Sequence, residues 1–171
     1  MNNLTQSYTG IITPLLVGNK PNTVDANKTK NNTDTAGSQG KINILYVDDD
    51  EISLLIFKTI FKDKYNIFTC LTTSKAREIL DKENIDIIAS DHYMPHETGR
   101  EFFKSISARY KDTIKILLTS HASTLGYISK ALASGEIWAH VVKPVEGEEL
   151  IKTFQKAENL ILSQRKHTSL K

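Results

Sequence analysis

The sequence predicts an α/β fold, a doubly wound sandwich in which helices cover both faces of a five-stranded parallel sheet. From Lys41 onward, short apolar runs alternate with segments of helical periodicity, and the connections between them are short. Most of the apolar runs are continuous, which is typical of strands that are buried on both faces. Alternating strands and helices of this kind favour a parallel sheet with right-handed crossovers.

Five strands are expected, in the apolar runs at residues 42–47, 65–70, 85–90, 114–119 and 137–142. Helical periodicity follows each of them, at residues 51–62, 74–82, 99–110, 123–133 and 147–162. Asp50 is expected to cap the first helix and Gly135 to end the fourth, because these residue types favour those positions. Five such units commonly give the flavodoxin-like strand order 2-1-3-4-5, in which strands one and three are neighbours.

The length and composition suit one globular domain with a tail. The chain has 171 residues, of which 39% are hydrophobic and 25% are charged, and such a composition can form a core. The net charge of +2 is small and the basic residues are scattered, so no nucleic-acid partner is expected. The single cysteine, Cys70, is expected to be buried and fits a reducing compartment. No apolar run reaches the roughly 18 residues of a membrane span, so the cytoplasm is the expected location.

Composition changes sharply near Lys41. Residues 1–40 are rich in Asn and Thr and poor in aromatic side chains, so we expect them to form a disordered N-terminal tail. The apolar island at residues 11–17 is compatible with a docking motif, with a strand-like piece resting on the domain, or with neither. We expect the folded domain at residues 41–162 and a short basic C-terminal tail at residues 163–171.

Polar side chains stand at the ends of four predicted strands, the first, third, fourth and fifth. They are Asp48-Asp49-Asp50, Asp91, Thr119 and Lys143. Because the carboxyl ends of parallel strands share one edge of a sheet, we expect these groups to meet there. Two ionised carboxylates 4 Å apart repel by about 4 kcal/mol at an effective dielectric constant near 20, so the cluster requires a cation or a shifted pKa. Oxygen ligands together with water and a phosphoryl group are the usual arrangement around magnesium.

Asp91 is the expected nucleophile of this cluster. Asp48 and Asp49 are adjacent in the sequence after the first strand and are therefore the better metal ligands, whereas Asp91 is a single acid in a polar loop. A single carboxylate facing a metal can attack phosphorus and form an aspartyl phosphate. Lys143 adds a compact positive charge, and Thr119 adds a hydroxyl, for the phosphoryl oxygens. The spacing also leaves open a register in which Asp49 and Asp50 hold the metal.

Four short motifs occur in order along the folded part of the chain. They are ILYVDDDE at 44–51, IIASDHYMP at 87–95, ILLTSHA at 116–122 and VVKP at 141–144. With this order and spacing, residues 41 to about 162 resemble a receiver domain of the two-component response regulator family. Gly99, shortly after the second motif, is expected to permit a turn. Pro144 in the fourth motif resembles the family's cis-proline.

This resemblance implies a role for each residue of the cluster. Asp91 would be the phosphoacceptor, and Thr119 and Lys143 would touch the phosphoryl group. The implied cofactor is Mg²⁺. Its implied ligands are Asp49 directly, Asp48 through water, Asp91, and the backbone carbonyl of Tyr93.

Two departures from the family's pattern bear on function. His140 stands where the family usually has Tyr or Phe, an aromatic that works with Thr119 as a switch, so we expect the output switch to be altered. Tyr93 and His121 stand two residues beyond the phosphoacceptor and the threonine, where side chains tune hydrolysis of the acyl phosphate. We expect the bulky Tyr93 to hinder the attacking water and to lengthen the life of the phosphoryl group.

The expected function is that of a stand-alone, single-domain response regulator rather than an enzyme with a separate substrate. A sensor histidine kinase or a histidine phosphotransfer protein would donate the phosphoryl group to Asp91. Only residues 163–171 follow the last predicted helix, so no output domain is expected. The output would be a protein–protein interaction, including dimerisation, through the face made by the fourth helix, the fifth strand and the fifth helix. Neither nucleic acid nor membrane is an expected partner.

Two alternatives stay open from the sequence. A haloacid-dehalogenase-type phosphatase would use Asp48 as its nucleophile together with Asp50. That enzyme needs a further acidic pair after a later strand, and it leaves Asp91 without a role. A degenerate receiver, used as a phosphorylation-independent binding module, is favoured by His140 and opposed by the intact acids.

Overall fold

The computed structural model of the protein describes residues 40–120, 125–145 and 147–168. One sheet of five parallel strands has the order β2-β1-β3-β4-β5, which confirms the predicted topology. The strands are β1 (Asn43–Val47), β2 (Asn66–Cys70), β3 (Ile87–Asp91), β4 (Ile114–Thr119) and β5 (Ala139–Val142). The helices are α1 (Glu51–Phe61), α2 (Thr73–Leu80), α3 (Gly99–Ile106), α4 (Leu125–Ala133) and α5 (Glu148–Thr168). The predicted N-terminal tail, apart from residue 40, and His121 lie outside the described residues.

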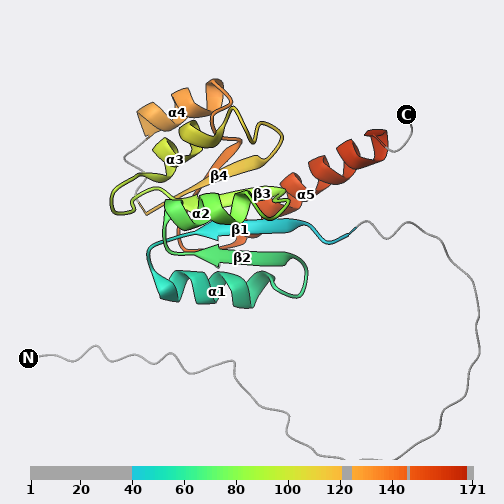
Figure 1. Cartoon of the computed structure of the whole chain (residues 1–171), viewed down its shortest axis with the longest axis horizontal. Coiled ribbons are helices and arrows are strands. Elements are labelled where there is room, and N and C mark those ends of the chain that lie inside the picture. Colours follow the sequence, from blue (N-terminus) through green and yellow to red (C-terminus); the bar gives the residue numbers. More distant parts are fainter. Residues whose placement is uncertain (1–39, 121–124, 146, 169–171) are drawn as a thin grey trace, which may run out of the picture. The chain divides into compact units, whose positions relative to one another are not determined.

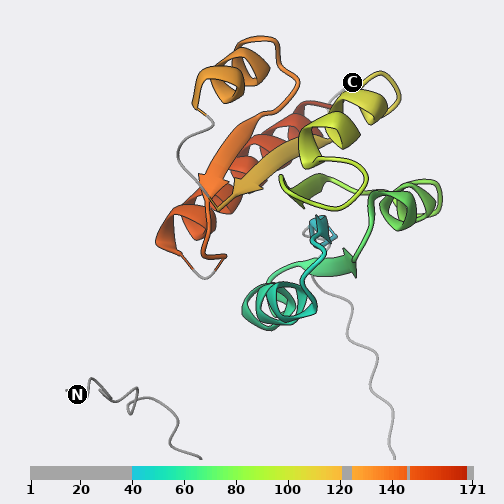
Figure 2. The same cartoon turned by 90° about the vertical axis from the view of Figure 1, so that its left-hand side faces the viewer.

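Helices cover both faces of the sheet (Figure 1, Figure 2). On one face, Phe57 of α1 and Phe154 of α5 pack with Tyr46 of β1 in one apolar cluster. On the other face, Phe102 and Phe103 of α3 belong to a second cluster together with side chains of α2 and α4. Every residue of the central strand β3 is buried, as expected for a strand covered on both sides. None of the described helices is both long enough and apolar enough to cross a membrane.

Polar caps fix where the helices begin. The side chain of Asp50 accepts hydrogen bonds from the backbone amides of Ile52 and Ser53, at 3.2 and 3.0 Å, which confirms its predicted place at the start of α1. At α3, Thr98 and Glu101 form a reciprocal capping box. Such caps satisfy amide groups that have no partner within the helix, and each is typically worth about 1 kcal/mol.

The connection between α4 and β5 differs slightly from the prediction. Gly135 adopts a φ of 71° just after α4, which confirms that it ends this helix. The backbone amide of Ile137 then donates to the carbonyl oxygen of Ala131. Because Ile137 is still bonded to the preceding helix, β5 begins at Ala139 rather than at 137.

Helix α5 extends beyond the predicted end at 162, as far as Thr168. Its apolar stripe stops earlier, which is why the sequence predicts a shorter helix. Polar contacts replace apolar ones in the last turns, where the guanidinium of Arg165 lies 2.6 Å from the carboxylate of Asp86. Part of the predicted basic tail at 163–171 is therefore helical.

The aromatic cluster between α1 and α5 generates a stability prediction. Phe154 is fully buried, and its ring lies edge-on to Phe57 and Phe61, with centroids 5.6 and 5.2 Å away. Phe154→Ala leaves a cavity in this cluster and should lower the free energy of unfolding by about 3–5 kcal/mol in urea titration. Ile52→Ala, at a side chain that is 66% exposed, should change it by less than about 0.5 kcal/mol. Equal effects of the two substitutions would contradict this assignment of the core.

Candidate functional site

Three charged side chains meet at the carboxyl edge of the sheet. The ammonium nitrogen of Lys143 lies 2.7 Å from Oδ2 of Asp48 and 2.7 Å from Oδ1 of Asp91. Asp48 directly follows β1, Asp91 ends β3, and Lys143 directly follows β5. Since β1 and β3 are hydrogen-bonded neighbours, their carboxyl ends bring the two buried acids together. The convergence expected from the strand order is therefore present.

The lysine is the counter-charge of both acids. Burial alone would lower the pKa of the Lys143 ammonium, but its contacts with Asp48 and Asp91 outweigh burial and raise that pKa. Burial raises the pKa of the Asp91 carboxyl, and the charge of Asp48 adds to this, although Lys143 acts in the opposite direction. A buried carboxylate with a raised pKa is a stronger base and a better nucleophile than one in water. The site therefore combines a reactive acid with a fixed positive charge.

Both carboxylate oxygens of Asp48 accept hydrogen bonds from the protein. The hydroxyl of Tyr46 donates to Oδ2, and the backbone amide of Asp50 donates to Oδ1 at 3.0 Å. Burial raises the pKa of Tyr46, as does the adjacent Asp48, so the phenol stays a neutral donor. The sequence analysis did not identify Tyr46 as a site residue. The signal was present, because residues two apart on a strand point to the same face.

Asp91 is held on one side only. Its Oδ2 accepts a hydrogen bond from the backbone amide of Tyr93 at 2.8 Å. Among the described residues, its Oδ1 has no hydrogen bond of acceptable geometry, so the Lys143 ammonium contacts it as an ion pair and not as a directed donor. Oδ2 is thus held by the backbone, whereas the contact of Oδ1 is with the side chain of Lys143.

Gly99 is needed for a close backbone approach, so the predicted role in a turn is not its main one. A Cβ atom on Gly99 would lie 2.1 Å from the carbonyl oxygen of Asp91 and 2.8 Å from the hydroxyl of Ser90. The Gly99 amide donates to the carbonyl oxygen of His92 at 3.0 Å, and this hydrogen bond holds the start of α3 close to the end of β3. The absent side chain lets α3 reach the backbone of the nucleophile.

The predicted metal ligands form an open donor set. Asp49 is exposed and borders a hollow of about 470 Å³, which Met94 and Pro95 also line. In the described part of the chain, no three His, Cys, Asp or Glu side chains are grouped closely enough to hold a metal ion by themselves. Mg²⁺ does not require such a group, because it commonly takes one or two carboxylates, a few waters and phosphoryl oxygens. The predicted ligands, Oδ1 of Asp91, the Asp49 carboxylate and the backbone carbonyl of Tyr93, are oxygen donors of the kind that requirement names.

The remaining predicted residues lie around this cluster. Thr119 is fully buried at the end of β4, and its carbonyl oxygen accepts from the backbone amide of Lys143 at 2.8 Å. His140 is half-buried in β5, opposite Leu117 of β4. Asp50 is engaged as the cap of α1, which disfavours the register in which it would hold the metal. The peptide bond between Lys143 and Pro144 is cis, as the sequence predicts.

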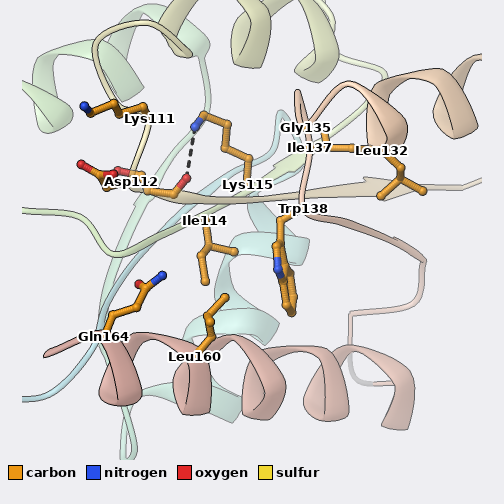
Figure 3. A pocket seen from close by; sticks show the side chains of 11 residues that line it. Lys111, Asp112, Ile114, Lys115, Leu132, Gly135, Ile137, Trp138, Leu160 and Gln164 are labelled. Atoms are coloured by element: carbon orange, nitrogen blue, oxygen red, sulfur yellow. Dashed lines mark hydrogen bonds between the residues drawn. The ribbon is translucent and has the colours of Figure 1, made fainter. Parts of the chain in front are cut away.

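A hollow of about 630 Å³ at the opposite edge of the sheet is not part of this site (Figure 3). It lies at the start of β4 and just before β5, where Trp138 faces Leu160 of α5. Its buried amine, Lys115, donates to the carbonyl oxygens of Tyr110 and Thr113 at 2.7 and 3.1 Å. None of the acids that converge on Lys143 lines it, so the acid chemistry is confined to the carboxyl edge.

Comparison with known proteins points to one family. The family model of the response regulator receiver domain matches residues 44–155. The hydrogenase transcriptional regulatory protein HoxA of Bradyrhizobium diazoefficiens is 24% identical over 122 residues, which are 71% of this chain and 25% of HoxA. The chain thus spans about a quarter of the length of this relative.

Two solved structures are similar over most of their own length. The chemotaxis response regulator CheY4 of Vibrio cholerae has a TM-score of 0.61 and 28% identity, over 69% of this chain and 99% of that one. The response regulator TrrA of Thermotoga maritima, solved with Mg²⁺ and beryllofluoride, has a TM-score of 0.58 and 28% identity. That match covers 68% of this chain and 98% of that one.

The close approach at Gly99 can be tested by substitution. Gly99→Ala should lower the free energy of unfolding by about 1–3 kcal/mol, because the added methyl group meets a backbone oxygen that cannot give way. Gly126→Ala in α4 is the control, since a Cβ there has nothing within 4 Å and favours the helix by up to about 1 kcal/mol. Urea unfolding of both variants measures the difference. If Gly99→Ala were as stable as the unchanged protein, α3 would not press on Asp91 as described.

Proposed function

The chain belongs to the response regulator receiver domain family, and we propose that it works as a phosphorylation switch with Asp91 as its phosphoacceptor. The phosphoryl donor would be a phosphohistidine on a sensor histidine kinase or on a histidine phosphotransfer protein. One observation carries this proposal: a buried carboxylate oxygen of Asp91 lies 2.7 Å from the Lys143 ammonium, at the carboxyl edge of the sheet.

The proposed reaction transfers the phosphoryl group from nitrogen to oxygen. Oδ1 of Asp91 attacks phosphorus, the bond between phosphorus and the imidazole nitrogen breaks, and the nitrogen keeps the electron pair of that bond. Lys143 stays within reach of the phosphoryl oxygens, and its positive charge favours the negative charge that builds up on them. Bound Mg²⁺, held by Asp49, by Asp48 through water and by the Tyr93 carbonyl, would supply further positive charge at the same oxygens.

The proposed switch follows from the charge that the phosphoryl group adds, about −1.5 to −2 at neutral pH. Lys143 then has a new partner besides Asp48. Thr119, at the end of β4, is proposed to donate its buried hydroxyl to the same phosphoryl group. A shift of these two groups would bias the neighbouring strand β5, including His140, and with it the face of α4, β5 and α5. The partner on that face would be a downstream protein or a second copy of the chain.

The lifetime of the phosphoryl group would be set by side chains at the entrance. Tyr93 is 50% exposed and its backbone amide is bonded to Asp91, which supports its proposed role in hindering water. His121 is the second proposed residue of this kind and lies outside the described residues. The free, buried thiol of Cys70 is compatible with the proposed cytoplasmic location.

The haloacid-dehalogenase-type alternative is not favoured by the geometry. Its nucleophile would be Asp48, whose two oxygens accept hydrogen bonds from Tyr46, Lys143 and the Asp50 amide. Its second acid would be Asp50, which caps α1. The contact of the acids with Lys143 disfavours the degenerate-receiver alternative, which His140 still favours.

The proposed phosphoacceptor can be tested with acetyl phosphate and Mg²⁺. The unchanged protein should gain one phosphoryl group by mass spectrometry, and Asp91→Asn should lose this gain because the attacking oxygen is replaced by an amide. Asp50→Asn is the matched control, since asparagine also caps helices and the phosphoacceptor is untouched. Labelling that persists in Asp91→Asn and vanishes in an Asp48→Asn variant would favour the phosphatase alternative.

A second test concerns the protein donor. Ile52 and Leu55 of α1 are each 66% exposed, and their spacing of three puts them on one side of the helix that starts beside the acids. A donor helix bundle that brings its histidine to Asp91 would cover this apolar surface. Ile52→Glu combined with Leu55→Glu should slow transfer from a phosphotransfer protein by about tenfold, the loss of about 1.4 kcal/mol of binding.

The same variant should react normally with acetyl phosphate, which needs no docking surface. Leu160→Glu on α5, a half-exposed apolar side chain at the opposite edge of the sheet, is the control for the protein donor. Equal slowing with both donors would show that the α1 substitutions damage the site itself and would contradict docking on α1.

A further inference from the structure

We infer that Arg77 of α2 is a positioning residue, which holds the loop between β3 and α3 in its metal-binding shape through an ion pair with Glu97. The two groups form a fork, with Nη1 of Arg77 2.9 Å from Oε2 of Glu97 and Nη2 2.7 Å from Oε1. Planar pairs of this kind fix orientation as well as distance. This inference rests on the proposed function, because the loop carries the proposed carbonyl ligand at Tyr93.

Arg77 is itself held from two other directions. Its Nη2 donates to the hydroxyl of Ser105 on α3 at 2.6 Å. Its guanidinium carbon lies 5.0 Å from the centre of the Phe102 ring, which is fully buried. Contact with Arg77 lowers the pKa of the Glu97 carboxyl, so the pair is charged at neutral pH. The contacts of Arg77 with Glu97 and Ser105, which we call the brace, therefore join α2, the loop and α3 at one point.

The loop needs support from outside. His96 adopts a φ of 71°, a left-handed conformation that is uncommon for residues other than glycine. Inside the loop, the Glu97 amide donates to the carbonyl oxygen of Pro95 at 2.9 Å. At its start, the Tyr93 amide is committed to Asp91. The Gly99 amide and the capping box at Thr98 hold the far end of the loop to the start of α3, and the side chain of Glu97 adds a contact to α2.

The two elements that the Arg77–Glu97 ion pair joins also line the hollow beside Asp49. The first residues of α2 and the loop residues Met94 to His96 face each other across the hollow of about 470 Å³ that Asp49 lines. Arg77 lies one helical turn after Thr73. It forms its ion pair with Glu97 just outside the residues that line this hollow. The ion pair thus ties α2 to the loop whose residues Met94 to His96 line the hollow together with Asp49.

Whether Mg²⁺ binding becomes stronger or weaker when Arg77 is replaced distinguishes a positioning role from a simple effect of charge. Removal of a positive charge near an acid cluster should by Coulomb's law strengthen the binding of a divalent cation. Loss of the brace should weaken it, because the carbonyl ligand is then no longer held in place. Replacing a residue that orients a metal ligand typically lowers metal affinity by about 10–100-fold, and for Arg77 we expect a loss of about tenfold.

The test compares Arg77→Met with Lys75→Met in the full chain. Lys75 lies on the same helix and pairs with Glu78 at 2.6 Å, an exposed contact that does not touch the loop. Both variants lose one positive charge. Isothermal titration with Mg²⁺ should give a dissociation constant about tenfold higher for Arg77→Met. Lys75→Met should leave it unchanged or slightly lower. Hydrogen exchange without metal should become faster at residues 92–98 in Arg77→Met alone.

A third variant, Arg77→Lys, keeps the charge and loses the fork. It should weaken Mg²⁺ binding by a smaller factor in the same direction, and it remains informative if Arg77→Met does not fold. Unchanged or tighter Mg²⁺ binding in both Arg77 variants, or equal weakening in Lys75→Met, would overturn the positioning role while the proposed function stands. Absence of Mg²⁺ binding in the unchanged protein would instead overturn the proposed function, and the inference with it.

Discussion

The contact of one ammonium group with two buried carboxylates is the interaction on which the site depends. Without Lys143, Asp48 and Asp91 would face each other at an edge of low dielectric, where like charges repel strongly. With it, each carboxylate has a positive partner at 2.7 Å, and burial raises the pKa of Asp91, which makes that carboxylate more basic than one in water. A phosphoryl group on Asp91 would change the balance of charge around the lysine. The same contact that stabilises the resting protein is thus the element that phosphorylation can alter.

The fold supplies this contact through its strand order. β1 and β3 are adjacent, and β5 lies beyond β4, so a long side chain is needed to reach back to both acids. The surroundings then fix each group in turn. Tyr46 and the Asp50 amide hold Asp48, the Tyr93 amide holds one oxygen of Asp91, and the second oxygen contacts Lys143. The ends of two strands and a long lysine side chain therefore position the carboxylate that we propose as the nucleophile.

Much of this arrangement follows from the sequence, because parallel strands with polar ends leave few choices. The strand order, the meeting of Asp48, Asp91 and Lys143, and the cap at Asp50 all depend on local patterns and one topological rule. Contacts between side chains far apart in sequence were not predictable in the same way. The fork between Arg77 and Glu97 depends on the path of a loop and on rotamers, which no periodicity encodes. The end of α5 was missed because a polar contact, and not an apolar stripe, extends it.

The most direct test of the account is an experimental structure of the protein with Mg²⁺ and beryllofluoride, which mimics a phosphoryl group. The account predicts the mimic on Oδ1 of Asp91, the metal between Asp49 and the Tyr93 carbonyl, and the Lys143 ammonium in contact with a fluorine. A mimic bound to Asp48, or a lysine that still bridges the two carboxylates with no adduct on Asp91, would contradict it.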